Sequence, residues 1–309
     1  MKPIAVTLGD PAGIGPEVVL KAVAGLEVPV WLFGSRRAAE QSASIPPGSR
    51  FHDVGAHPAP IRFGEISSEH GRIALASIDQ AVEAVERGDC CALVTAPIHK
   101  QAMAAAGSPF PGHTELLAAR AGLTHYGREF AMYFDSPAIR TVLLTVHVPL
   151  REALTAINAS AIADLALLTR AGYQRLYGSA PRIAVAAVNP HAGEGGRFGS
   201  EEEEIARGVE QAARHGIDIS GPHPADTLFL AAREGKYDVV MAMYHDQGLI
   251  PVKTLAFETS VNVTLGLPYL RASVDHGTAF DIAGKGVADA RPMRYAIEWT
   301  ARHAERWSR

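Results

Sequence analysis

Short apolar runs alternate with helix-like segments along nearly the whole chain, and this alternation constrains the fold more than any other feature of the sequence. Strands that alternate with helices are typical of a mainly parallel sheet flanked by helices. The sequence therefore predicts an α/β fold. The expected strands are Ile4–Leu8, Pro29–Phe33, Ala92–Thr95, Thr141–Val146, Ile183–Val188 and Val239–Met243, and the expected helices are Pro16–Ala24, Ile73–Arg87, Ser160–Tyr177, Glu201–His215, Asp226–Arg233 and Met293–Arg309.

The length and the charge limit the number of domains and the kinds of partner. Because single cores usually split beyond about 250–300 residues, a chain of 309 residues is expected to form two lobes. The net charge of −4 gives no electrostatic reason to expect a nucleic-acid or membrane partner. No apolar run approaches the roughly 18 residues of a membrane span, and the N-terminus lacks a signal-peptide pattern. Cys90 and Cys91 are adjacent, which suits neither a disulfide nor a zinc CxxC site, so we expect a reduced, cytoplasmic protein.

Residues 243–286 hold an unusual density of charged and polar side chains on an apolar background. These side chains occur singly and next to turn residues such as Gly248, Pro251 and Gly266. Loops at the ends of rigid elements are where binding and catalytic side chains concentrate. The segment is expected to form loops that supply most of an active site, and the alternative is an irregular surface segment with scattered charges.

Three of the predicted strands lead into a histidine, namely His147, His191 and His245. Ligands collect beyond the carboxyl ends of the strands in open α/β sheets, so three such ends can converge. Neutral imidazoles bind several divalent metals, and three protein ligands leave an open position for a substrate. A single histidine after a strand is more often only hydrogen-bonded, and it is the repetition that favours a metal site. Asp246 either orients the imidazole of His245 or caps the next turn.

Three further loops hold candidate ligand contacts. LGDPAGIGPE (8–17) joins a strand to a helix without the GxGxxG pattern, and a tight turn and a ligand contact are equally good interpretations. His113 and Thr114 precede a helix, where an anion can bind, and Lys100 ends the segment TAPIHK.

The acidic run after His191 has a structural interpretation. Ser200 and Glu203 have the spacing of a capping box, and Glu201–Glu204 reads as the solvated first turn of a helix, without a chemical role. Farther along the chain, Lys253 and Arg271 are cations suited to phosphate or carboxylate groups, although each alone is more often a surface residue.

Together these segments resemble the PdxA family of 4-hydroxythreonine-4-phosphate dehydrogenases, and the resemblance covers nearly the whole chain. The segment DHGTAFDIAGKGVADA (275–290) also resembles the nucleotide-binding stretch of the isopropylmalate dehydrogenase superfamily. The other landmarks are GDPAGIGPE (9–17), TAPIHK (95–100), PGHTE (111–115), VNPHAGEGG (188–196), GPHPADTLF (221–229), YHDQGLIPVK (244–253) and VNVTLGLPYLRASVDHGTAFDIAG (261–284).

The resemblance implies a two-lobed fold like that of isocitrate and isopropylmalate dehydrogenases, with the active site in a cleft between the lobes. The first lobe would comprise residues 1–112 and 278–309, and the second, residues 113–277, would hold the metal and the dimer contacts. The family is homodimeric with a shared active site. By this resemblance, the metal ligands are His147, His191 and His245, and the cofactor contacts are Gly277, Thr278 and Asp281. The substrate contacts are His113, Thr114, Lys253, Asn262 and Arg271. Lys253 is also the candidate proton carrier.

The implied reaction is oxidation and decarboxylation of 4-phosphooxy-L-threonine by NAD or NADP with a divalent metal (Zn, Mg, Mn or Co), in pyridoxal phosphate biosynthesis. TAPIHK in place of the family's usual TAPINK, and Ile250 in QGLIPVK, resemble the subgroup that acts on 4-phospho-D-threonate or 4-phospho-D-erythronate. A phosphate acyltransferase of related fold, a metallohydrolase and a non-catalytic phosphometabolite-binding protein are the alternatives from other classes.

Overall fold

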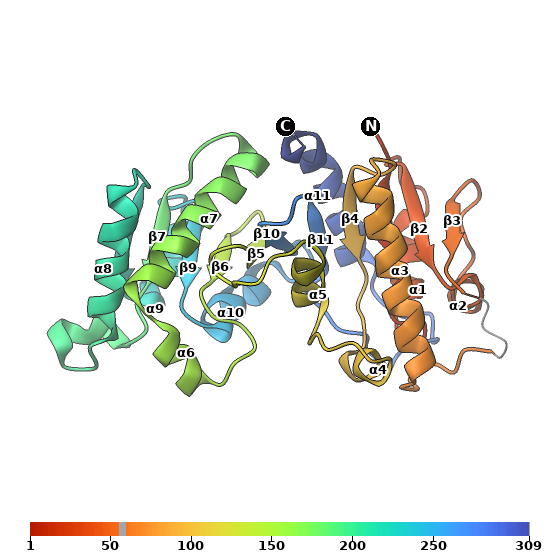
Figure 1. Cartoon of the computed structure of the whole chain (residues 1–309), viewed down its shortest axis with the longest axis horizontal. Coiled ribbons are helices and arrows are strands. Elements are labelled where there is room, and N and C mark those ends of the chain that lie inside the picture. Colours follow the sequence, from red (N-terminus) through yellow and green to blue (C-terminus); the bar gives the residue numbers. More distant parts are fainter. Residues whose placement is uncertain (56–59, 309) are drawn as a thin grey trace. The chain divides into compact units, whose positions relative to one another are not determined.

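The computed structural model describes residues 1–55 and 60–308, and the chain divides into two compact units. Unit 1 comprises Met1–Ala121 and Pro268–Arg309, and unit 2 comprises Gly122–Leu267. Figure 1 shows the elements of both, coloured along the chain.

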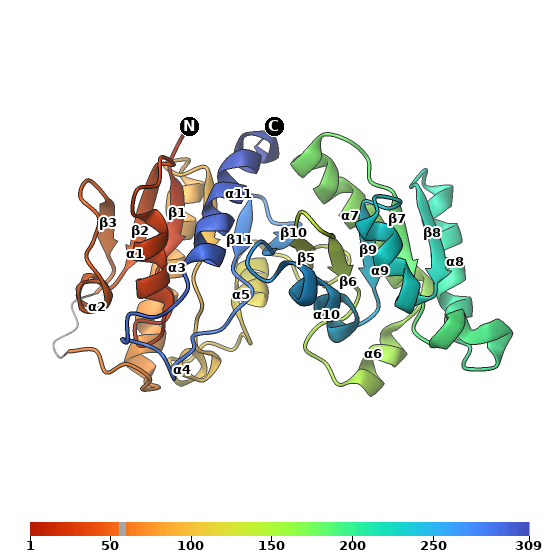
Figure 2. The same cartoon turned by 180° about the vertical axis from the view of Figure 1, so that it is seen from behind.

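Unit 1 is a parallel sheet with helices on both faces. Its strand order is β3-β2-β1-β4-β11, and every neighbouring pair is parallel. Helix α3 lies on one face, and α1 and α11 lie on the other (Figures 1 and 2). All residues of β1 and β4 are buried, as expected for central strands covered on both faces. The elements are β1 (Ile4–Thr7), α1 (Gly15–Val23), β2 (Val30–Gly34), α2 (Arg36–Ser42), β3 (Arg50–Asp53), α3 (Ser68–Glu86), β4 (Ala92–Thr95), α4 (Lys100–Ala105), α5 (His113–Arg120), β11 (Arg271–Ser273) and α11 (Arg291–Trp307).

Unit 2 has a mixed sheet in the order β10-β5-β6-β9-β7-β8. The pairs β10–β5 and β5–β6 are antiparallel, whereas β6–β9, β9–β7 and β7–β8 are parallel. Helices α7 and α8 cover one face, and α9 and α10 cover the other (Figures 1 and 2). The elements are β5 (Ala131–Asp135), β6 (Thr141–Leu143), α6 (Leu150–Ala156), α7 (Ala159–Tyr177), β7 (Ile183–Ala186), the short 3-10 segment η1 (Pro190–Gly196), α8 (Glu201–Arg214), β8 (Ile219–His223), α9 (Ala225–Arg233), β9 (Val239–Ala242), α10 (His245–Ala256) and β10 (Val261–Leu265).

The predicted α/β class with mainly parallel strands flanked by helices is confirmed. The unit boundaries fall at residues 121/122 and 267/268, whereas the sequence placed them at 112/113 and 277/278. Residues 268–277 belong to unit 1 because β11 pairs with β4. The predicted last helix runs to Trp307, and Arg309 lies outside the described residues.

The segment 243–286 departs most from its prediction as a set of loops. It contains the helix α10 and the strands β10 and β11. Pro251 lies inside α10, and a proline there removes a helical hydrogen bond, so the sequence read as turn-rich. His245, Asp246 and Lys253 therefore lie on α10 and Arg271 lies on β11, whereas the charged residues after β11 remain in a loop.

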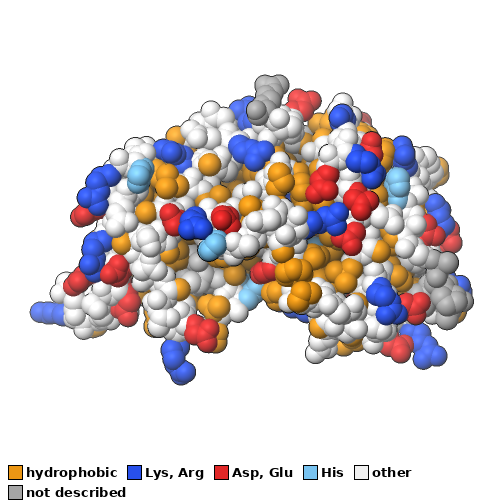
Figure 3. Space-filling model, in the orientation of Figure 1, with side chains coloured by type: hydrophobic (Ala, Val, Ile, Leu, Met, Phe, Trp, Pro, Cys, Tyr) orange, Lys and Arg blue, Asp and Glu red, His pale blue; other side chains and the backbone are white. Residues whose placement is uncertain are grey.

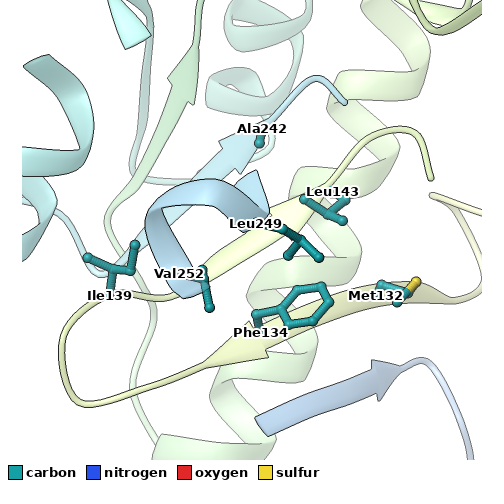
Figure 4. Packing of buried hydrophobic residues seen from close by; sticks show 7 residues of the cluster. All are labelled: Met132, Phe134, Ile139, Leu143, Ala242, Leu249 and Val252. Atoms are coloured by element: carbon teal, nitrogen blue, oxygen red, sulfur yellow. The ribbon is translucent and has the colours of Figure 1, made fainter. Parts of the chain in front are cut away.

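The helix α10 is held to its sheet by a buried apolar cluster (Figure 4). Leu249 and Val252 point from the helix toward Leu143 of β6, Phe134 of β5 and Ala242 of β9. Gly248 allows this approach, because a Cβ there would lie 2.5 Å from a methyl group of Leu143. The first turn of α10, which begins at His245, is thereby fixed at the carboxyl ends of β6 and β9.

The surface carries charges of both signs. Figure 3 shows acidic and basic side chains interspersed over one face, in agreement with the small net charge. Among the described helices, none by itself is long and apolar enough to cross a bilayer, although α6 and α7, bent by 88°, satisfy the length and composition criteria as a pair.

Candidate functional site

His147 and His245 lie side by side in unit 2. Their ring centroids are 5.7 Å apart and their planes are inclined by 42°. His147 follows β6 and His245 follows β9, and these two strands are parallel neighbours, so their carboxyl ends lie at the same edge of the sheet. Both imidazoles line a pocket of about 250 Å³, together with Thr145, Leu150 and Tyr244. Two of the three predicted metal ligands are therefore adjacent.

Asp246 orients the imidazole of His245. Its Oδ1 lies 2.7 Å from Nδ1 of His245. In the neutral imidazole, Nδ1–H donates to this carboxylate, so Nε2 keeps its lone pair. This is the orienting role that was one of the two sequence-based interpretations of Asp246.

His191 lies in η1, beyond the end of β7, and β7 is the parallel neighbour of β9. The three histidines thus follow three adjacent parallel strands, β6, β9 and β7. The backbone at His191 is left-handed, with φ of 52°, as it is at Ala192 and Glu194. Non-glycine residues in this conformation are strained and are found mainly where the surroundings impose them.

The donor set fits a divalent metal in kind. Three imidazoles with an open position suit Zn, Co or Ni, and the hydrogen bond from His245 Nδ1–H to Asp246 is a common support for a metal-bound histidine. Within residues 1–55 and 60–308, however, no three His, Cys, Asp or Glu side chains are already grouped closely enough to hold an ion.

The acidic run 201–204 includes a residue that sequence reasoning missed. The capping box is wrong in the described structure, because the side chain of Ser200 makes no capping bond to α8. Glu202 is buried, and its Oε1 accepts hydrogen bonds from the backbone N–H groups of Val188 and Asn189 at 3.1 and 2.8 Å. In the sequence, the only available clue to the burial of Glu202 was the helical period, which places it on the inward face of α8.

His113, Thr114 and Arg271 come together in unit 1, where α5 begins and β11 starts. Arg271 is 2 % exposed and donates to the hydroxyl of Thr95 at 2.7 Å. Burial lowers the pKa of Arg271 to about 10, which still leaves the guanidinium charged at neutral pH. Burial, and then the nearby Arg271, lower the pKa of His113 well below its usual value, so the imidazole is neutral. A neutral donor beside a buried cation suits an anionic ligand group.

One ring nitrogen of His113 supports this interpretation. Its Nε2 is buried and has no hydrogen-bond partner among the described residues. Buried polar groups are nearly always paired, so an unsatisfied one requires an explanation. A bound phosphate or carboxylate would supply the partner.

The predicted cofactor residues lie against the glycine-rich loop that follows β1. The carbonyl of Thr278 accepts from the backbone N–H of Ile14 at 2.9 Å, and a Cβ at Gly13 would lie 2.9 Å from Cβ of Thr278. Gly277 and Asp281 are exposed beside this contact. The buried loop 8–17 therefore packs against the segment 277–281 within unit 1.

The same loop holds a buried carboxylate that the sequence analysis did not single out. Asp10 is fully buried, and burial raises its pKa, although His70 and His99 act in the opposite direction. The ring of His99 stacks on Phe280 at 4.6 Å. In the sequence, Asp10 is a charged residue among glycines and prolines, and this pattern could have marked it as a candidate site residue.

The two remaining predicted contacts belong to unit 2. Lys253 lies in the last turn of α10 and is half-buried. Asn262 is buried on β10, and its Oδ1 has no hydrogen-bond partner in the described part of the chain.

The fold and these side chains define an α/β protein with clustered imidazoles at one sheet edge and a buried cation prepared for an anion. Residues 10–300 match the family described as "Pyridoxal phosphate biosynthetic protein PdxA". The chain belongs to this PdxA family, as its motifs predicted.

Relatives and a solved structure agree with this assignment. The chain is 43% identical to a 4-hydroxythreonine-4-phosphate dehydrogenase of Beijerinckia indica, over 97% of this chain and 94% of the relative. It is 41% identical to a D-threonate 4-phosphate dehydrogenase of Salmonella typhimurium, over 96% and 97% of the two chains. The crystal structure of a 4-hydroxythreonine-4-phosphate dehydrogenase from Klebsiella pneumoniae superimposes with a TM-score of 0.87 at 38% identity, and covers 98% of this chain and all of its own. These relatives are all named dehydrogenases, so the family is one of oxidoreductases.

Proposed function

We propose that the protein oxidises and decarboxylates 4-phosphooxy-L-threonine to 3-amino-2-oxopropyl phosphate, using NAD or NADP and a divalent metal. The observation that carries the proposal is the placement of His147, His245 and His191 at the ends of three adjacent parallel strands, in a chain with relatives named 4-hydroxythreonine-4-phosphate dehydrogenase. These histidines would hold the metal.

The chain's own residues would bind and orient the substrate. Arg271 and His113 offer a permanent cation and a neutral N–H donor to the phosphate or the carboxylate. Thr114 adds a hydroxyl, and Asn262 adds an amide. Held in this way, the substrate presents its carbinol carbon in a fixed orientation, which removes much of the entropic cost of reaction.

The chemistry requires hydride and proton acceptors. A nicotinamide cofactor held by unit 1 would supply the hydride acceptor, and a divalent metal held by the three histidines would supply Lewis-acid polarisation of the substrate's oxygens. Lys253 is the proposed proton carrier: it would take the hydroxyl proton during oxidation and return a proton to carbon after carbon dioxide leaves. Gly277, Thr278 and Asp281 are the proposed cofactor contacts. We also propose a cytoplasmic homodimer.

A second candidate substrate class is supported by specific observations. Several relatives of comparable identity are named D-threonate 4-phosphate dehydrogenases, and His99 and Ile250 depart from the usual biosynthetic motifs. 4-Phospho-D-threonate and 4-phospho-D-erythronate share the phosphate and the hydroxy acid, so the same machinery would serve them.

Steady-state kinetics with the three substrates separates these candidates. The proposal expects the highest kcat/KM with 4-phosphooxy-L-threonine. A clear preference for 4-phospho-D-threonate or 4-phospho-D-erythronate would instead support the second substrate class. Parallel assays with NAD and NADP would identify the cofactor.

A further inference from the structure

The backbone hydrogen bonds between the histidine-bearing strands stop before the histidines are reached. Between β6 and β9 the last such bond runs from Leu144 N–H to the carbonyl of Ala242, at 2.8 Å. Between β7 and β9 the paired register ends at Val185 and Met241. The segments that lead to the imidazoles need other contacts to keep their spacing.

Two side chains continue these ladders. The hydroxyl of Thr145 donates to the carbonyl of Met243 at 2.8 Å, which joins the segments after β6 and β9. Gln247 joins the segments after β9 and β7: its Oε1 accepts from Met243 N–H and its Nε2 donates to the carbonyl of Ala187, both at 2.7 Å. The three strand ends are thus tied in sequence by side chains.

Glu202 ties the third segment to α8. Its Oε1 accepts hydrogen bonds from the backbone N–H groups of Val188 and Asn189, and its Oε2 accepts a third from the side-chain Nδ2 of Asn189 at 3.0 Å. These bonds hold the two residues immediately before Pro190 and His191. Hydrogen bonds to a buried carboxylate are stronger than those between neutral groups, so this anchor can maintain the left-handed turn that follows.

We propose that Glu202 and Gln247 are positioning residues for the metal site, which hold the His191 and His245 segments at the spacing that a metal requires. This inference rests on the proposed function, because it takes the histidines as metal ligands. The structural basis is a pair of hydrogen bonds, from Gln247 to the carbonyl of Ala187 and from Asn189 N–H to Glu202, which hold the chain just before the left-handed turn at His191.

The test measures Co²⁺ affinity by calorimetry and the melting temperature of the metal-free protein, for wild type and four variants. Glu202→Ala removes the anchor, and Glu202→Gln keeps one acceptor oxygen. Gln247→Met replaces the bridge by an apolar chain of similar length. Glu203→Ala is the matched control, because it removes an exposed carboxylate from the same helix turn.

Loss of a residue that supports metal ligands typically weakens affinity by about 10–100-fold. We expect a loss of this size for Glu202→Ala and Gln247→Met, a smaller loss for Glu202→Gln, and wild-type affinity for Glu203→Ala. If Glu202→Ala does not fold, Glu202→Gln and Gln247→Met still decide the question.

The outcomes separate the two levels of the argument. Wild-type Co²⁺ affinity in Glu202→Gln and Gln247→Met, even with a lower melting temperature, would overturn the positioning role and leave the metal site intact. Absence of Co²⁺ binding by the wild type would overturn the metal site itself.

Discussion

The imidazoles of His147 and His245 lie 5.7 Å apart, centroid to centroid, on the carboxyl ends of two adjacent parallel strands. They come from positions far apart in the sequence, and the parallel pairing of β6 and β9 brings them together. A third strand end, with His191, is next in the same sheet.

Replacing His245 with Ala is expected to lower metal-dependent turnover by at least about a hundredfold, because a ligand is removed rather than merely supported. Metal content after dialysis and the rate of NADH formation are the measurements. His215→Ala, an exposed histidine at the end of α8, is the control and should behave as wild type. A His245→Ala protein with normal metal content would refute the assignment of this ligand.

Replacing Arg271 with Lys is expected to raise KM for the phosphorylated substrate about tenfold or more, because a lysine cannot reproduce the planar set of donors. Steady-state kinetics gives KM and kcat separately. Arg62→Lys changes an exposed arginine in the same unit and serves as the control. An unchanged KM in Arg271→Lys would show that the guanidinium does not bind the substrate.

His113 predicts a specific dependence of stability on pH. Its pKa in the folded protein lies well below its usual value, whereas the unfolded chain titrates near about 6.5. The folded state therefore binds fewer protons below that pH, so stability is fully present above about pH 6.5 and falls as the pH drops toward the folded pKa. The contribution of one group is at most about 1.4 kcal/mol per pH unit.

The variant His113→Asn should lack this contribution. Urea unfolding of both proteins between pH 8 and pH 5 gives the two free energies of unfolding. We expect the wild type to lose more stability than the variant on acidification. A difference between the two proteins that does not change with pH would contradict a neutral, buried His113.

The packing of α10 gives a prediction on stability. Leu249→Ala should destabilise the protein by about 2–5 kcal/mol, because it opens a cavity against Leu143 and Phe134. Ile250→Ala, at the next residue, should change stability by less than about 0.5 kcal/mol, because its side chain is 65% exposed. Denaturant unfolding compares them, and equal losses would contradict the packing shown in Figure 4.

Local patterns were enough to predict the buried strands β1 and β4, but not the equally buried strands β5, β10 and β11. The runs at β1 and β4 are continuous and apolar because both strands are buried on both faces, and such runs are visible in a single sequence. The strands β3 and β8 were not predicted, because neither contains a fully buried residue and so neither shows an apolar run. Helix α10 was not predicted because it contains Pro251, and a proline is incompatible with an ideal helix interior.

The sequence was enough to predict the candidate metal ligands, but not the residues that hold them in place. Histidines at strand ends are visible as a repeated pattern, whereas the roles of Glu202 and Gln247 depend on side chains that reach backbone atoms of other segments. Hydrogen bonds of this kind leave no periodic signature. The burial of Asp10 likewise follows from the approach of the loop at Pro97, whose carbonyl accepts from Asp10 N–H at 2.9 Å.

The most direct test of the account is NADH or NADPH formation by the wild type with 4-phosphooxy-L-threonine, measured as purified, after chelation, and after Zn²⁺, Mg²⁺, Mn²⁺ or Co²⁺ is restored. The account predicts turnover that chelation abolishes and a divalent metal restores. Turnover that is insensitive to chelation would contradict the metal site. Absence of turnover with this substrate and with both sugar acids would contradict the proposed function.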